Sequence, residues 1–262
     1  MSTSLEALFT PADFAGLKTR NLSQTLCVVF DVLRATSSMV TALASGAAAI
    51  VPVEEIAEAL ALRKQQPEIL LAGERDGVRI QASLTGTIAF DLGNSPGEFT
   101  REAVAGRTIA MSTTNGTRAL RACAHARSVL ISSFLNLQAT ADAIRKVAPA
   151  RLLLVCSGTY DQAAYEDILC AGAVCDLLWP QYAEGDVADS ALLARKLFQL
   201  EQADLLGALS QSRNGRRLLA QPALHDDVAF CAQRDRFALV ATLGKNGKVT
   251  TRNALGKTLN QS

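Results

Sequence analysis

The chain has 262 residues, of which 49% are hydrophobic and 19% charged, a composition that excludes an intrinsically disordered protein. With 26 Lys and Arg against 25 Asp and Glu, its net charge is +1. No overall positive field would therefore attract nucleic acid or an anionic membrane surface, and any basic site is expected to be local.

Apolar strands followed by hydroxyl-rich turns recur three times. The strands are predicted over residues 26–30, 108–111 and 152–155, each a continuous apolar run of the kind that helices cover on both faces. Helices are predicted over 39–50, 54–66 and 136–148, where apolar residues recur at helical spacing. This alternation indicates a doubly wound, mostly parallel sheet, that is, a three-layer α/β/α fold.

The C-terminal part has a different pattern. Residues 187–235 are helical and more charged, and 237–253 read as a β-hairpin turning at Asn246 and Gly247, which we expect at an edge of the sheet. No linker rich in Pro, Gly or Ser divides the chain. Residues 1–262 are therefore expected to form a single α/β unit, with two related strand-turn-helix halves at 1–135 and 136–262.

The first polar turn follows the strand 26–30. Asp31, Arg34, Thr36 and Ser37 lie there, before the next helix. In open α/β sheets ligands bind beyond the carboxyl ends of strands, and helix N-termini present free N–H groups to anions. Asp31 is thus placed for metal or proton chemistry. The alternative is that Asp31 or Ser37 only caps the helix.

The second turn, 112–118, is dense in hydrogen-bond donors. Its candidate substrate-binding residues are Thr113, Thr114, Asn115, Gly116, Thr117 and Arg118. Glycine lets the backbone approach a ligand closely, so the turn resembles an oxyanion cradle. It has neither the P-loop nor the dinucleotide-binding spacing, and an Asx-turn with a helix cap is the alternative.

The third turn combines donors with carboxylates. Ser157, Gly158 and Thr159 end the third strand, and Glu166 and Asp167 open the next helix after a short loop. Oxygen ligands of this kind suit Mg²⁺, which keeps several waters and binds phosphate oxygens directly. The alternative is a pair of solvated carboxylates at a helix start.

Two further glycine-containing turns carry polar residues. The turn 73–77 holds Glu74 and Arg75, and the turn 90–96 holds Asp91 and Asn94. Each could be ordinary turn chemistry, and so could the acidic pair 226–227 at a helix start. With only two histidines in the chain, a Ser-His-Asp hydrolase is disfavoured.

Taken in order, FDVLRATSS, AGERDG, FDLGNSP, STTNGT, CSGT with EDILCAGA, and DDVAFC resemble the 2-phosphosulfolactate phosphatase family over residues 30–231. The resemblance implies a Mg²⁺-dependent enzyme of coenzyme M biosynthesis that hydrolyses (2R)-O-phospho-3-sulfolactate to (2R)-3-sulfolactate and phosphate. Site roles carry over to the matched residues Asp31, Arg34, Glu74, Asp91, Asn94, Thr113, Asn115, Ser157, Glu166 and Asp167. The loop YDQAAY lacks the glycines expected in the family.

Our working hypothesis assigns Mg²⁺ to Asp31, Glu166 and Asp167, with Glu74 and Asp91 as further candidate ligands. Catalytic roles are expected for Asp31, Arg34, Asn115 and Glu166. Arg34 would bind the phosphate, and Arg75 or Arg118 would neutralise the substrate's carboxylate or sulfonate. Attack by water or by Asp31 is left open. The alternatives are a broader 2-hydroxy-acid phosphate phosphatase and a non-catalytic module that binds phosphorylated or sulfonated metabolites.

No run of about 18 apolar residues and no signal-peptide pattern occurs, so we expect a cytoplasmic protein. The expected partner is a small phosphorylated acid, with neither nucleic acid nor membrane. The six cysteines form no Cys-x-x-Cys pair, which favours reduced thiols over structural zinc. A homodimer is the commonest soluble assembly and is the expected one.

Overall fold

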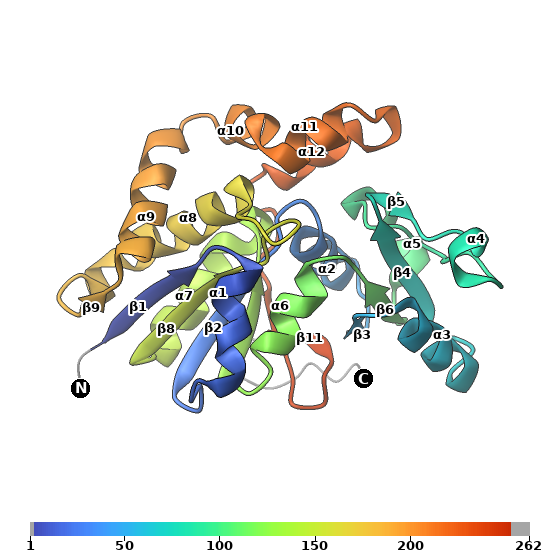
Figure 1. The fold of residues 1–262 in the computed structure, drawn as a ribbon, viewed down its shortest axis with the longest axis horizontal. Helices are drawn as coiled ribbons and strands as arrows, with labels where there is room; N and C mark the ends of the chain where they lie inside the picture. Colours follow the sequence, from blue (N-terminus) through green and yellow to red (C-terminus); the bar gives the residue numbers. More distant parts are fainter. Residues whose placement is uncertain (1–2, 253–262) are drawn as a thin grey trace.

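The computed structural model describes residues 3–252. Within them the chain forms one eleven-stranded, mostly parallel sheet flanked by helices (Figure 1). The strand order is β5-β4-β6-β3-β11-β10-β7-β2-β8-β1-β9. The strands are β1 Ser4–Leu8, β2 Thr25–Phe30, β3 Ala49–Val53, β4 Leu70–Arg75, β5 Val78–Arg79, β6 Thr108–Ser112, β7 Ser128–Ser132, β8 Arg151–Cys156, β9 Asp186–Val187, β10 Val240–Leu243 and β11 Val249–Arg252.

The sheet consists of two parallel blocks joined by the C-terminal hairpin. Strands β4, β6 and β3 form one block, and β7, β2, β8, β1 and β9 form the other. Hairpin strands β10 and β11 pair antiparallel with β7 and β3 respectively. The hairpin was therefore predicted correctly, but its expected position at an edge was wrong, because both of its strands find a second partner inside the sheet.

Helices cover both faces of the sheet, which confirms the three-layer α/β/α prediction. They are α1 Pro11–Ala15, α2 Ala35–Ala44, α3 Ile56–Gln65, α4 Ala82–Thr85, α5 Arg101–Val104, α6 Gly116–Ala122, α7 Leu137–Val147, α8 Tyr165–Tyr182, α9 Asp189–Glu201, α10 Leu205–Gln211, α11 Arg213–Leu219 and α12 His225–Cys231. In the part of the chain that the structure describes, no helix is long and apolar enough to cross a membrane.

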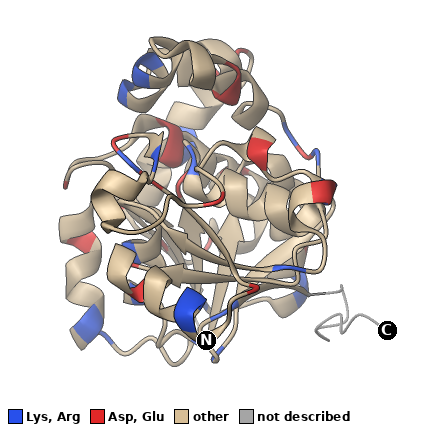
Figure 2. Cartoon of the chain, turned by 90° about the vertical axis from the view of Figure 1, so that its right-hand side faces the viewer, with Lys and Arg blue, Asp and Glu red and all other residues tan. Residues whose placement is uncertain are grey.

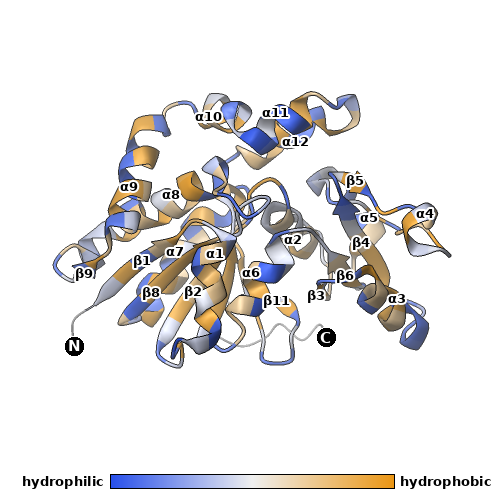
Figure 3. Cartoon of the chain, in the orientation of Figure 1, coloured by the Kyte–Doolittle hydropathy of each residue, from blue (hydrophilic) through white to orange (hydrophobic). Residues whose placement is uncertain are grey.

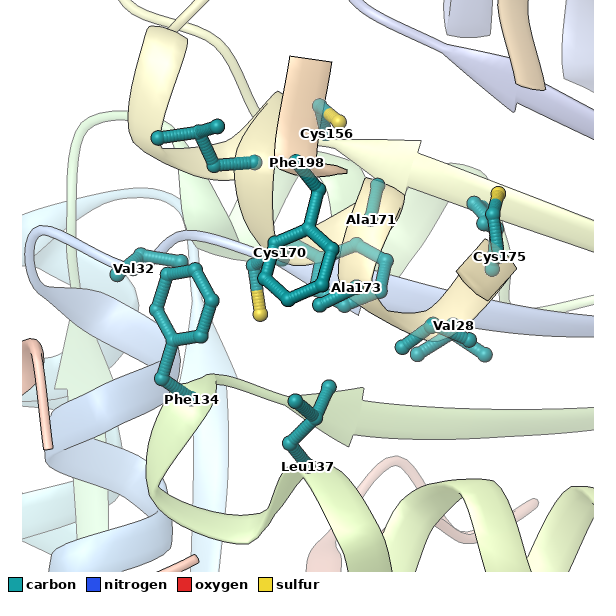
Figure 4. Close-up of a cluster of buried hydrophobic side chains, with 14 of the residues drawn as sticks. Val28, Val32, Phe134, Leu137, Cys156, Cys170, Ala171, Ala173, Cys175 and Phe198 are labelled. Atoms are coloured by element: carbon teal, nitrogen blue, oxygen red, sulfur yellow. The ribbon is translucent and has the colours of Figure 1, made fainter. Parts of the chain in front are cut away.

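Two large hydrophobic cores lie on opposite faces of the sheet. Strand β2 supplies both, because Val28 and Phe30 face one core while Cys27 and Val29 face the other. The first core packs under α7, α8 and α9, and Figure 4 shows Val28, Phe134 and Phe198 converging there. Every residue of β2 is buried, as the continuous apolar run predicted. Figure 3 shows this hydrophobic interior beside the more hydrophilic α11.

One predicted helix is too long. The segment 39–50 was expected to be helical throughout, but α2 ends at Ala44 and β3 begins at Ala49. Gly46 has a φ of 93°, a conformation that ends a helix and that glycine adopts without strain. The strand that follows lies in the sheet between β6 and β11.

The order of strands also bears on the two proposed halves. Strand β2, from residues 1–135, lies between β7 and β8, and β8 belongs to residues 136–262. Helices α10 to α12 then cross over the loops that follow β2 and β8, at the top of Figure 1. Residues from both halves therefore meet at one end of the sheet.

Candidate active site

A pocket lies beyond the carboxyl ends of the central strands, under α11. The residues that line it include several that the sequence analysis predicted and six that it did not. It is formed by Asp31, Leu33, Arg34, Glu74, Asp76, Asn94, Thr113, Thr114, Asn115, Thr159, Tyr160, Asn214, Arg217 and Leu218. Ligands bind at this end of open α/β sheets, so the position agrees with the fold.

Asp31 lies directly after β2 and is 8% exposed. Its Oδ1 accepts a hydrogen bond of 3.1 Å from the backbone N–H of Ala35, in the first turn of α2. Gly116 packs against its other side, where a Cβ atom would lie 2.9 Å from Asp31 Oδ2. A side chain at position 116 would therefore displace the carboxylate. The predicted cradle glycine allows α6 to approach Asp31.

Glu166 and Asp167, in the first turn of α8, are 1% and 2% exposed and lie behind the pocket wall. Asp167 accepts hydrogen bonds from the backbone N–H groups of Val32, at 2.8 Å, and Gly158, at 3.2 Å. Glu166 Oε1 accepts one of 2.6 Å from Asn214 Nδ2. Its Oε2 is buried and has no hydrogen-bond partner within residues 3–252.

The three carboxylates affect one another's protonation. Burial, together with the charges of Glu74 and Glu166, raises the pKa of Asp31 to about 7. Burial and then the charges of Glu166 and Asp31 raise the pKa of Asp167 well above its ordinary value. Burial raises the pKa of Glu166 as well. Buried like charges disfavour ionisation, so this cluster needs either protons or a cation.

Glu74, at the end of β4, holds the cradle turn. Its Oε1 accepts hydrogen bonds from the backbone N–H and the hydroxyl of Thr114, at 3.0 and 2.9 Å. Its Oε2 accepts one of 2.7 Å from the N–H of Gly77. Both oxygens are thus engaged by the protein, and Glu74 fixes the loop before α6.

Arg34 is buried, at 3% exposed, and is held by two partners. Its Nη1 donates to Asp227 Oδ2 at 2.6 Å, and its Nη2 donates to the carbonyl oxygen of Gly77 at 2.7 Å. Asp227, on α12, also accepts from the hydroxyl of Ser95. One member of the acidic pair 226–227 is therefore an ion-pair partner of a pocket arginine, which explains a motif that could also have been a helix cap.

Two pocket side chains carry buried polar atoms that no described residue satisfies. They are Asn94 Oδ1 and Thr113 Oγ1. Buried polar atoms are normally hydrogen-bonded, so unpaired ones that line a pocket indicate groups that a ligand or water satisfies. Thr159, on the opposite wall, accepts a 2.8 Å hydrogen bond from Asn214 Nδ2 through its hydroxyl.

Three predicted residues lie elsewhere. Asp91 accepts hydrogen bonds from the backbone N–H of Leu71, at 2.7 Å, and from Arg63, and it does not line the pocket. Arg75 donates to the backbone carbonyls of Glu74 and Glu54, and Arg118 contacts the exposed Asp161. Both arginines line a neighbouring cleft of about 900 Å³ instead. That cleft shares Thr113 and Thr114 with the pocket, but neither arginine is among the residues that line the pocket itself.

Five other predicted substrate-binding residues support the site from behind, outside the pocket lining. Thr36 accepts from the backbone N–H of Asp31, and the hydroxyls of Ser37 and Thr117 donate to backbone carbonyls. Ser157 donates its N–H to Phe30. Gly158 has a φ of 68°, and a Cβ there would lie 2.4 Å from the carbonyl oxygen of Gln162. These residues shape the turns instead of lining the pocket.

Comparison with known proteins decides the family. The model of the 2-phosphosulpholactate phosphatase family matches residues 13–246. Curated proteins named "Probable 2-phosphosulfolactate phosphatase" include one from Caldicellulosiruptor saccharolyticus, 36% identical over 82% of this chain and 87% of its own length. One from a Synechococcus strain is 42% identical (81% and 86%), and one from Caldanaerobacter subterraneus is 36% identical (93% and 98%). The chain belongs to this family.

For a chain of this family, the fit of the site to a divalent cation is tested by its own atoms. Among the described residues no three His, Cys, Asp or Glu side chains form a ready metal site. Mg²⁺, however, is usually held by one or two carboxylates and completes its shell with water and substrate phosphate oxygens. The unpartnered Glu166 Oε2, together with the buried charge of Asp31 and Asp167, fits such a cation.

Most of the pocket residues that the sequence analysis missed come from two loops and from α11. Asp76 and Tyr160 lie on loops after strands, and Asn214 and Arg217 lie on α11. The stretch RNGRR at 213–217 is an unusual cluster of cations and an amide, and that signal could have identified α11.

Proposed function

We propose that this chain hydrolyses 2-phosphosulfolactate to sulfolactate and phosphate and that it requires Mg²⁺. The observation that carries the proposal is a buried carboxylate cluster, with one unpaired oxygen on Glu166, behind a pocket that also contains a buried arginine. The reaction proposed is the one given in the names of the family and of its members. A substrate rich in negative charge needs a cation among these acids.

The chain's own residues bind and orient the substrate. Arg34 is held rigidly by Asp227 and the Gly77 carbonyl, which leaves its remaining N–H groups for phosphate oxygens. Thr113 donates its unpaired hydroxyl, and Asn115 lies beside it at the start of α6. Asn94 accepts a hydrogen bond from a hydroxyl or a water through its unpaired Oδ1.

Asp31 and Glu166 would hold Mg²⁺, with Asp167 fixing the loop after β2 behind them. Bound there, the ion would supply stabilisation of the charge that develops on phosphate. Asp31, whose pKa is about 7, suits two roles at neutral pH. It can accept a proton from an attacking water, or it can attack phosphorus itself.

Phosphate release is the test of this proposal. Purified protein is assayed with phosphosulfolactate, phospholactate and phosphoglycerate, each with Mg²⁺ and with EDTA. We expect Mg²⁺-dependent release that is fastest on phosphosulfolactate and that falls by about a hundredfold or more in Asp31→Asn. Equal rates on all three acids would indicate a broader phosphatase. Release from none of them, with or without metal, would leave a binding module and refute the hydrolase.

Rapid quenching separates the two chemical routes. A phosphoenzyme that is trapped in the native protein and absent in Asp31→Asn would support attack by Asp31, whereas turnover without any trapped species would support water.

We place the enzyme in the cytoplasm and expect a homodimer. All six cysteines are free and buried, as is usual in a reducing compartment. Figure 2 shows acidic and basic residues interspersed along the chain, and this fits a small-molecule partner better than nucleic acid or a membrane surface. Light scattering on the purified protein measures the oligomeric state.

A further inference from the structure

Two arginines line the pocket, and they differ in how firmly the protein engages them. Arg34 is 3% exposed and forms a 2.6 Å ion pair with Asp227, which is also buried. Arg217, on α11, has a side chain that is 34% exposed, and its acidic neighbour Asp76 is 85% exposed at 3.5 Å. The charge of Arg34 is therefore largely balanced within the protein, whereas that of Arg217 is balanced only by a weak surface contact.

We propose that Arg217 binds the acidic group of the substrate that is not the phosphate, that is, its sulfonate or carboxylate. This inference rests on the proposed function, and it replaces Arg75 and Arg118, which line the neighbouring cleft. A substrate with several negative charges enters a pocket whose lining contains Asp31, Glu74 and Asp76. Arg217 is the cation of that lining with the most exposed side chain.

The position of Arg217 suits one ligand held at two points. A Cβ atom placed on Gly77 would lie 3.9 Å from Arg34 Nη2 and 3.8 Å from Arg217 Nη2. The two guanidinium groups therefore both lie next to the same point of this short loop. A small acid bound by Arg34 at its phosphate would have its second acidic group within reach of Arg217.

The contacts of Arg217 orient it without satisfying all of its donors. Its Nη1 donates to the Tyr160 hydroxyl at 2.9 Å, and that hydroxyl donates to Asp76 at 3.3 Å. We call Asp76, Tyr160 and Arg217 the rim group. A guanidinium has five N–H donors, so those that these contacts leave over are available to an oxyanion. Its planar shape matches the geometry of a carboxylate or sulfonate.

The experiment compares two substrates in three proteins. The value of kcat/KM is measured with Mg²⁺ for phosphosulfolactate and for p-nitrophenyl phosphate, which has no acidic group except its phosphate. The variants are Arg217→Met and the matched control Arg216→Met, which removes the neighbouring arginine of α11, a residue outside the pocket lining. In Arg217→Met the preference for phosphosulfolactate should fall by about tenfold to a hundredfold. In Arg216→Met it should stay near the native value.

Direct binding gives a readout that does not depend on turnover. Calorimetric titration with sulfolactate and, separately, with inorganic phosphate reports the two ends of the pocket. Arg217→Met should weaken sulfolactate binding by about tenfold or more and phosphate binding by much less. Arg217→Lys keeps the charge but loses the planar fork, so its affinity for sulfolactate should lie between those of the native protein and Arg217→Met. Equal losses for both ligands or both substrates would make Arg217 a structural residue and overturn the inference.

Failure of the inference is distinguishable from failure of the proposed function. If the native protein releases phosphate from phosphosulfolactate, but Arg217→Met binds sulfolactate as tightly as the native protein does, the phosphatase function stands and the role of Arg217 is refuted. If the native protein releases no phosphate, but binds sulfolactate and loses that binding in Arg217→Met, the binding role of Arg217 stands and the phosphatase function is refuted. Thermal unfolding of both methionine variants checks that each is folded.

Discussion

The two walls of the pocket are built on opposite principles. The inner wall contains Asp31 and Arg34, with Glu166 behind it, all at most 8% exposed and held by backbone N–H groups or by partners distant in sequence. In the rim group, Asp76 and Tyr160 are exposed to solvent and Arg217 is partly exposed. Burial makes each inner charge strong and each missing partner costly, whereas rim contacts are weak and easily exchanged. Chemistry suits the first environment, and selection of the substrate suits the second.

The largest expected effect comes from breaking the buried ion pair of the inner wall. Asp227→Ala leaves Arg34 buried without its carboxylate, so the free energy of unfolding should fall by about 3–5 kcal/mol. Urea denaturation measures the change. The matched control is Asp226→Ala, because the Asp226 side chain is fully exposed beside it, and this variant should lose about 0.5 kcal/mol or less. Similar losses in the two variants would contradict the contrast between buried and exposed charges.

The pH dependence of stability tests the carboxylates of the same wall. The folded state raises the pKa of Asp31 from an ordinary 3.8 to about 7, so it binds this proton more tightly than the unfolded chain does. In EDTA the contribution of Asp31 to the free energy of unfolding should therefore fall as pH rises from about 4 to about 7, and it should stay constant above that range. Asp167, whose pKa is also raised, adds to the same trend.

Thermal unfolding of the metal-free protein between about pH 4 and pH 8 measures this slope. Asp31→Asn should flatten it, because an amide does not titrate, and Mg²⁺ should stabilise the native protein most at the alkaline end. A native protein that becomes more stable as pH rises through that window, to the same extent as Asp31→Asn, would show that the buried carboxylates do not control its stability.

Asn214 connects the two walls. The effect of replacing it should be smaller than that of breaking the buried ion pair and larger than that of replacing an exposed residue. Its Nδ2 donates both to Glu166 Oε1 and to Thr159 Oγ1, which orients the unpaired Glu166 Oε2. Residues that orient metal ligands contribute about tenfold to a hundredfold in affinity. Asn214→Ala should therefore raise the Mg²⁺ concentration needed for half-maximal thermal stabilisation by about tenfold or more. Arg216→Met, on the same helix, is the control, and an equal shift in both would refute a specific role.

The fold and the inner wall were largely predictable from the sequence, and the reason is local. Strands that are buried on both faces read as apolar runs, and a polar residue at their carboxyl end stands out, as Asp31 does after β2. The position of the hairpin in the sheet was not predictable, because an Asn-Gly turn specifies which two strands pair and says nothing about their outer neighbours.

The partners of the inner wall were beyond local reasoning. Arg34 and Asp227 are 193 residues apart, and Glu166 and Asn214 are 48 apart. Each pair meets because α11 and α12 cross over the ends of the strands, which no residue pattern near Arg34 or Glu166 encodes. The same crossing explains why Arg75 and Arg118 were predicted and Arg217 was missed. Arg75 ends β4 and Arg118 lies in the first turn of α6, both close in sequence to the polar turns, whereas Arg217 lies in the distant helix α11.

The smallest expected effect concerns Asp91, a predicted metal ligand that lies outside the pocket lining. Its carboxylate is 35% exposed and joins Arg63 to the backbone of β4. Asp91→Asn should lower the free energy of unfolding by about 1 kcal/mol or less, since a half-exposed ion pair contributes little. The Mg²⁺ dependence of phosphate release should stay that of the native protein, because the amide lies apart from Glu166 and Asp31. A requirement for much more Mg²⁺ in this variant would extend the metal-binding wall to β4 and refute the division between inner wall and surface.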